Sequence, residues 1–168
     1  MNRRLPLLAT AVLAAIMALP AATATGQNPG GRTITLFERE DAGTFAFVDN
    51  APKSRARGEE PDVSSGDEFV LTIPLFHRSK DRAGTLHGHC VATRARKSFA
   101  RSTFLCRAVI KLGTGNLAIE GVFTGSEGPE ESPFAITGGT GAYDGARGSF
   151  TSRDLRGGRH EDKIRLLP

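Results

Sequence analysis

The sequence predicts an all-β domain, folded as an antiparallel sandwich or barrel. Short segments of alternating apolar and polar residues recur along the chain, and each is bounded by Gly, Pro, Asp or Ser. No window beyond the N-terminal region repeats its apolar residues with the period of a helix. Short strands at this spacing, separated by turn residues, are typical of sandwiches and barrels.

Eight segments are predicted as strands, and they are separated by turns or by longer polar stretches. They are residues 33–38, 44–49, 68–76, 84–93, 103–112, 116–124, 133–137 and 148–155. A further segment, 163–166, is a candidate for extending the sheet. The polar stretch 50–66 is predicted to be a surface loop, and the acidic stretch 125–132 a turn.

The first 24 residues predict export rather than fold. Arg3 and Arg4 precede an apolar run over 5–19, and Ala22-Thr23-Ala24 follows as a small-residue cleavage pattern. This order is typical of a secretory signal peptide. The apolar run is shorter than the ~20 residues that span a bilayer, which disfavours the alternative of a membrane anchor. We therefore expect a secreted protein with a polar leader over 25–32 and one domain over 33–168.

Charge and cysteine content narrow the class of protein. The formal net charge of +4 includes Arg3 and Arg4, so the mature chain carries only a mild excess and no nucleic-acid partner is expected. An exported chain with two cysteines is expected to form one disulfide. If the segments 84–93 and 103–112 form a hairpin in which Arg94 pairs with Ser102, Cys90 lies opposite Cys106.

The alternation along the strands also predicts which residues face inward. Inward positions are expected to be apolar and to line any pocket: Leu36, Phe69, Leu71, Ile73, Phe104, Ile119, Phe123 and Phe150. On the first strand the same parity places Glu38 on the inner face. A carboxyl group in that position is expected to be functional or paired, since burying an isolated charge is costly.

The sequence gives less support to a metal site, to nucleophilic catalysis and to nucleotide binding. His87 and His89 share one strand face and could begin a metal site, but the parity puts them on the outer face, which favours surface histidines and no metal. No nucleophile elbow is present. The glycine-rich stretch 136–150 lacks the third glycine of a dinucleotide loop, and a strand-like segment follows it rather than a helix. We therefore interpret this stretch as a connection between strands.

That stretch, "GGTGAYDGARGSF", closely resembles the signature of plant dirigent proteins and their bacterial relatives. "SSGDEFVLTIPLF", "GTLHGHCVAT" and "FLCRAVIKLGTGNLAIEGVF" look like further segments of the same group. The resemblance runs from about Thr33 to Leu155. It implies an eight-stranded antiparallel β-barrel of the allene oxide cyclase and dirigent type, calycin-like, with an apolar cavity and no cofactor. A homo-oligomer, a dimer or trimer, is compatible with it.

The resemblance also suggests an activity and two site residues. Members of the group hold a reactive substrate in one conformation for stereoselective coupling or cyclisation. Arg147 occupies the Arg of the signature, and Glu38 resembles an acidic residue on the first strand of the cyclases. We expect a small apolar ligand, with Glu38 and Arg147 as catalytic or anchoring groups. The rival expectations are a lipocalin-like binding or structural protein without chemistry, and a surface interaction module.

Overall fold

The computed structural model describes residues 31–168 except 52–61, 79, 97, 126–131 and 156. The expected signal peptide and most of the polar leader lie outside these residues. Within the described part the chain forms nine strands: β1 (Thr33–Arg39), β2 (Thr44–Val48), β3 (Glu68–Phe76), β4 (Arg82–Arg94), β5 (Thr103–Leu112), β6 (Gly115–Thr124), β7 (Ser132–Gly139), β8 (Gly148–Asp154) and β9 (Arg159–Leu166). Three short 3-10 turns accompany them: η1 (Glu40–Ala42), η2 (Phe99–Arg101) and η3 (Gly141–Tyr143). No helix in these ranges is long and apolar enough to cross a bilayer.

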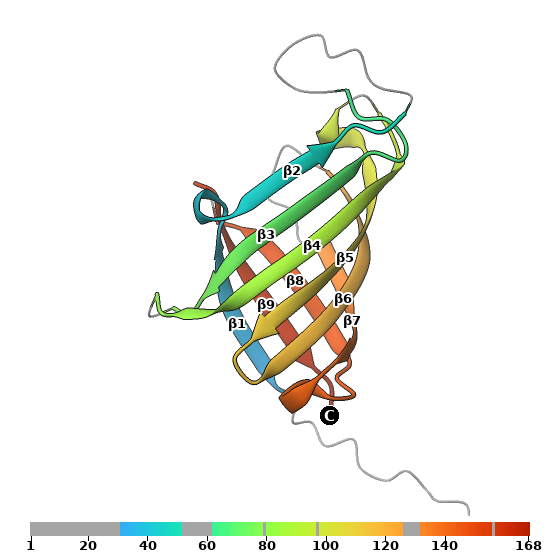
Figure 1. Cartoon of the computed structure of the whole chain (residues 1–168). Helices are drawn as coiled ribbons and strands as arrows, with labels where there is room; N and C mark the ends of the chain where they lie inside the picture. Colours follow the sequence, from blue (N-terminus) through green and yellow to red (C-terminus); the bar gives the residue numbers. More distant parts are fainter. Residues whose placement is uncertain (1–30, 52–61, 79, 97, 126–131, 156) are drawn as a thin grey trace, which may run out of the picture.

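The strands close into a barrel in which every neighbouring pair is antiparallel (Figure 1). The order is β1-β9-β8-β7-β6-β5-β4-β3, and β3 returns to β1 through the pairs Phe37↔Phe76 and Glu38↔Leu75. This ring has eight members, which confirms the predicted eight-stranded barrel. Because β1 ends at Arg39 and turns away through η1, β2 takes its place beside the first half of β3.

The membership of the ring differs from the prediction at two segments. Segment 44–49 was expected in the barrel, but β2 pairs with β3 alone and lies outside the closed ring. Segment 163–166 was expected only as an extension, but β9 is a full member that pairs with β1 over seven positions and with β8 over seven. Some charged residues of β9 face inward, so its sequence lacks the alternation of apolar and polar residues that predicts a strand.

The predicted hairpin and disulfide are confirmed. Cys90 lies directly opposite Cys106 on β4 and β5, and the two are joined in a disulfide with their Cα atoms 4.0 Å apart. The expected pairing of Arg94 with Ser102 is wrong by one position. A bulge between Ala92 and Arg94 shifts the register there, so Arg94 pairs with Thr103.

Two groups of buried side chains fill the barrel interior. The first, which we call the plug, closes the end where η3 lies. It includes Leu36, Leu75, Ile110, Leu117 and Ile164, each at most 1% exposed. The second, towards the opposite end, gathers Phe69, Phe104 and the disulfide. The Phe69 and Phe104 rings meet edge to face with their centroids 5.0 Å apart. The alternation predicted from the sequence is therefore confirmed on β1, β3, β5 and β6.

The glycine-rich stretch is a strand connection, as predicted. Its amides bind the β5–β6 hairpin. Thr140 N donates to the Asn116 carbonyl at the start of β6, and Ala142 N donates to the Thr114 carbonyl in the turn, each over 2.9 Å. Gly141 has a φ of +62°, a conformation that glycine adopts without steric cost. Tyr143 is buried against the barrel plug, and β8 follows the turn. The motif therefore closes one end of the barrel.

Candidate ligand cavity

The barrel encloses a cavity of about 440 Å³ between the two buried groups, open towards the end that carries η2. Its lining comes from both halves of the sheet. Most of it is apolar: Leu71, Ile73, Leu86, Ile119, Phe123, Phe134 and Phe150, with the disulfide in the wall. Phe99 of η2 stands at the mouth, 38% exposed, and its ring packs on those of Phe69, Phe104 and Phe123. A volume in this range suits a small organic ligand.

Small residues create the space in this cavity. Leu71, Gly88, Ala108 and Ile119 form one row across β3, β4, β5 and β6, and the two central positions have almost no side chain. A Cβ on Gly88 would lie 2.9 Å from the Leu71 side chain. The cavity is therefore set by the size of the residues at the middle of this row.

One side of the cavity is polar, and strands β1, β9 and β8 supply it. Glu38, His160 and Asp154 form one rung of inward-facing residues, and Asp162 and Ser152 belong to the next rung towards the plug. We call these five residues the polar wall. Its exposure decreases inward: Asp154 is exposed, His160 and Ser152 are half-buried, and Glu38 and Asp162 are 7% and 0% exposed.

Asp162 is the fully buried acid of the polar wall. No atom of the described residues meets the geometry of a hydrogen bond to either of its carboxyl oxygens. Burial raises the pKa of Asp162 to about 6, because the charged form is poorly solvated there. The Glu38 carboxyl, the Ser152 hydroxyl and the charge of His160 lie close enough to pull the pKa of Asp162 partly back. Asp162 can therefore exchange a proton near neutral pH.

The structure places only one of the two predicted catalytic residues at the cavity. Glu38 lines the cavity as expected from its parity. Arg147 is exposed in the turn between η3 and β8, at the plugged end, where its carbonyl accepts a 2.8 Å hydrogen bond from Leu167 N. It is not among the cavity-lining residues.

The predicted pocket residues divide between the cavity and the packed core. Leu71, Ile73, Ile119, Phe123 and Phe150 line the cavity. Leu36 lies in the plug, and Phe69 and Phe104 lie in the aromatic group beside the disulfide. Alternation alone identifies inward residues, but packing decides which of them border empty space.

Four residues of the polar wall were not predicted as site residues from the sequence: Ser152, Asp154, His160 and Asp162. A signal was present in "RHEDKIRL" (159–166), where His160 and Asp162 share the parity of Ile164 and Leu166. Polar residues at inward positions of an alternating strand indicate a lined cavity. The predicted segment 163–166 begins after His160 and Asp162, so neither residue was expected at the cavity.

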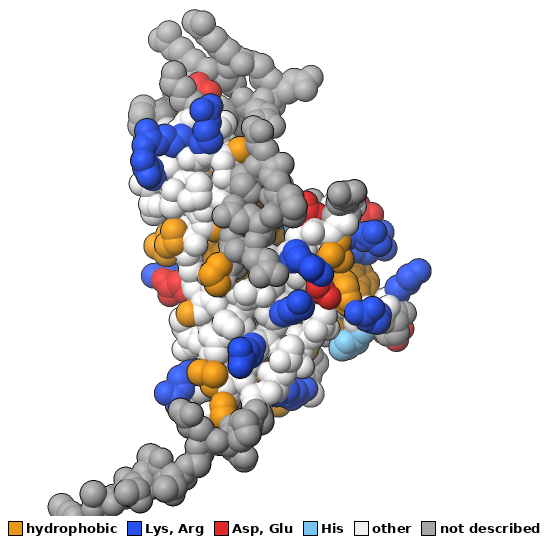
Figure 2. Space-filling view, turned by 180° about the vertical axis from the view of Figure 1, so that it is seen from behind, with side chains coloured by type: hydrophobic (Ala, Val, Ile, Leu, Met, Phe, Trp, Pro, Cys, Tyr) orange, Lys and Arg blue, Asp and Glu red, His pale blue; other side chains and the backbone are white. Residues whose placement is uncertain are grey.

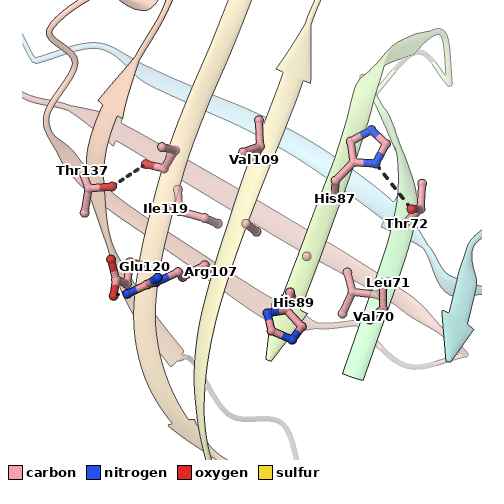
Figure 3. A pocket seen from close by; sticks show the side chains of 13 residues that line it. Val70, Leu71, Thr72, His87, His89, Arg107, Val109, Ile119, Glu120 and Thr137 are labelled. Carbon is pink, nitrogen blue, oxygen red and sulfur yellow. Dashed lines mark hydrogen bonds and ion pairs between the residues drawn. The ribbon is translucent and has the colours of Figure 1, made fainter. Parts of the chain in front are cut away.

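A shallow depression of about 420 Å³ lies on the outer side of the same strands (Figure 3). His87 and His89 border it, on the outer face as expected. His89 Nε2 lies 2.7 Å from a Glu68 carboxyl oxygen, and His87 Nδ1 lies 3.4 Å from the Thr72 hydroxyl. Among residues with described positions, no group of three or more His, Cys, Asp and Glu side chains could hold a metal ion.

Comparisons with known proteins agree with this architecture. No curated protein matches the chain. Among solved structures, a pyocyanin demethylase superposes with a TM-score of 0.62 at 22% identity, over 81% of this chain and 100% of that one. A pterocarpan synthase dirigent protein gives 0.59 at 16% identity, over 84% and 97%. An exo-specific intermolecular Diels-Alderase gives 0.58 at 15% identity, over 83% and 99%.

At these identities the solved structures establish a shared fold. The family described as "Allene oxide cyclase barrel like domain" matches residues 49–166, which is most of the chain. That match covers strands β3 to β9. It includes the glycine-rich closure and the four polar-wall residues of β8 and β9, which are Ser152, Asp154, His160 and Asp162. This chain belongs to the allene oxide cyclase barrel-like family.

Proposed function

We propose that the barrel cavity binds a small, largely apolar molecule and orients it for a cyclisation or coupling reaction. The observation that carries the proposal is the pairing of an apolar cavity with a buried acid of raised pKa at one side. Apolar walls can bind the ring or chain of a ligand without requiring hydrogen bonds from it. A carboxyl group that titrates near pH 6 can give or accept a proton at neutral pH.

We propose a different role in this reaction for each residue of the polar wall. Glu38 borders the cavity and can contact the ligand directly, so we propose it as the acid or base. Asp162 lies one rung deeper and touches Glu38, so it acts as a positioning residue that determines which carboxyl holds the proton. His160 and Asp154 border the open side and would meet a polar group on the ligand.

The comparisons support the proposal without specifying a substrate. The named activities of the solved relatives include a demethylase, a dirigent protein and Diels-Alderases. A barrel that hosts such varied reactions supplies a preshaped pocket, and the residues of the wall decide the chemistry.

Native mass spectrometry of the protein, purified gently from its own host, tests whether the cavity is occupied. We expect a co-purifying organic molecule of a size that fits about 440 Å³. Incubating the emptied protein with that molecule should then return either the same mass or a rearranged product. An unchanged ligand would favour the alternative of a carrier without chemistry. The absence of any ligand, together with no binding from a library of apolar compounds, would refute the cavity proposal.

We further propose that the protein is secreted after cleavage near Ala24. The disulfide Cys90–Cys106 supports an oxidising destination. Intact-mass analysis of protein from the culture medium should give a chain that begins near Thr25. Retention of residues 1–24 on protein found only with cells would contradict this proposal.

A further inference from the structure

A second concavity adjoins the ligand cavity, and Glu38 lines both. It measures about 580 Å³ and is formed by the end of β1, the β3–β4 hairpin and the β8–β9 turn. Its floor includes Phe37 and Phe76, which pair across β1 and β3. We call it the basic groove. Its lining includes four cations, two acids and three apolar residues: Arg39, Arg78, Lys80, Arg159, Glu38, Asp41, Phe37, Phe76 and Leu155.

Positive charge dominates this groove. Arg39 is neutralised by Asp41, whose carboxyl oxygen lies 2.8 Å from its guanidinium. Arg78, Lys80 and Arg159 make no ion pair with any carboxylate in the described part of the chain. In the view from behind, lysine and arginine side chains gather around a hydrophobic patch at the side where this hairpin projects (Figure 2).

The floor of the groove is aromatic, and it orients one of the cations. Phe37 and Phe76 are direct neighbours across β1 and β3 and both face outward. The Arg78 guanidinium carbon lies 5.6 Å from the centre of the Phe37 ring, in a cation–π arrangement. This contact holds the guanidinium beside an apolar surface.

Lys80 occupies a backbone position that usually belongs to glycine. Its φ is +72°, and among the non-glycine residues that the structure describes it alone has a positive φ. Lys80 N donates to the His77 carbonyl and His77 N to the Asp81 carbonyl, each over 2.9 Å, so the residue closes a tight hairpin loop. A side chain at a positive φ is strained relative to glycine, and the Lys80 side chain lines the basic groove.

We propose that the basic groove binds a small organic anion, with its charged group between Lys80, Arg78 and Arg159 and its apolar body on Phe37 and Phe76. Three unpaired cations attract a sulfonate, carboxylate or phosphate group. The phenyl floor adds affinity for a ring. Glu38 borders both the groove and the barrel cavity, whereas Lys80, Arg78 and Arg159 line the groove alone.

Calorimetric titration with sodium naphthalene-2-sulfonate tests the proposal, with 2-naphthol as the neutral analogue. We expect the sulfonate to bind more tightly than 2-naphthol and to shift the NMR signals of the Arg78 and Arg159 side chains. Lys80→Gly and Arg159→Gln should each weaken binding about tenfold, since each removes one charge-assisted contact. Arg107→Gln is the matched control. It also removes one cation, but on β5, where Arg107 pairs with Glu120, so it should leave sulfonate binding unchanged.

Lys80→Gly separates binding from folding. Glycine fits the positive φ, so this variant should unfold at the same or a higher denaturant concentration while binding the sulfonate less tightly. Equal affinity in Lys80→Gly, Arg159→Gln and the wild type would overturn the proposal. So would tight binding of 2-naphthol, or sulfonate-induced shifts confined to cavity residues such as Phe150.

Discussion

Glu38 and Asp162 bring two carboxyl groups together inside the barrel, from diagonal inward positions on the neighbouring strands β1 and β9. Neither side chain is more than 7% exposed. Two buried carboxyl groups in contact favour a shared proton over two charges. This relationship makes the polar wall a candidate for acid–base chemistry, and it also has consequences for stability.

The stability of the fold should fall as the pH rises from about 4 to about 6. The pKa of Asp162 is about 6 in the folded protein and 3.8 when unperturbed, so within this window the unfolded chain loses a proton that the folded protein keeps. Folding then becomes less favourable by about 3 kcal/mol in total as Asp162 is forced to ionise. Urea unfolding of the wild type and Asp162→Asn at several pH values measures the difference.

In Asp162→Asn this part of the pH dependence should disappear. Asp144→Asn, at an exposed position in the turn after η3, should keep the slope of the wild type. If Asp162→Asn and the wild type had parallel stability profiles, the raised pKa of Asp162 would be refuted.

Replacing Glu38 should move the pKa of Asp162 in a direction that reveals where the proton lies. Contact with Glu38 lowers the pKa of Asp162, and a hydrogen bond donated by Glu38 would act in this direction. Glu38→Leu removes this donor and should raise the pKa of Asp162 further, whereas Glu38→Gln retains a donor and should leave it near 6. Titration of the Asp162 carboxyl carbon by NMR measures both. A lower pKa in Glu38→Leu would mean instead that Glu38 is ionised.

Filling the cavity should abolish ligand binding without unfolding the barrel. Ala108 sits at the centre of the row whose small residues create the space, so Ala108→Leu places a branched side chain there. Thermal unfolding with the co-purified ligand should show stabilisation of about 3 kcal/mol in the wild type at a hundredfold excess over Kd, and none in this variant.

Val109→Leu provides the matched control for the filled cavity. Val109 is the next residue of β5, but it faces outward and is 41% exposed. This variant should bind the ligand as the wild type does. Equal stabilisation of Ala108→Leu by the ligand would show that the ligand binds elsewhere.

The disulfide should contribute about 3 kcal/mol to the stability of the barrel. It closes a loop with a sequence separation of 16, and a crosslink over such a loop restricts the unfolded chain by roughly that amount. Denaturant unfolding of the wild type with and without dithiothreitol measures the effect. The double variant Cys90→Ala/Cys106→Ala should have the stability of the reduced wild type, and dithiothreitol should not change it. If dithiothreitol lowered the stability of this variant, the effect on the wild type could not be assigned to the disulfide.

Much of the barrel could be predicted because local alternation encodes it. The inward apolar residues of β5 follow strictly every second position, and the Cys90–Cys106 pairing followed from aligning two such strands. The bulge after Ala92 could not be predicted. The apolar and polar residues of β4 and β5 alternate on both sides of the extra residue, so the sequence pattern does not reveal it. β9 was underestimated because charged residues at inward positions break the apolar pattern.

By itself the sequence determined the fold class, the inward position of Glu38 and the partner of each cysteine, since these depend on alternation and on pairing between neighbouring strands. Only the tertiary structure decided the composition of the site. Closure of the ring brings β1 beside β9, more than a hundred residues apart in sequence, and so places Asp162 against Glu38. The same closure leaves Arg147 exposed at the plugged end, and it brings Arg159 to the groove that also holds Lys80.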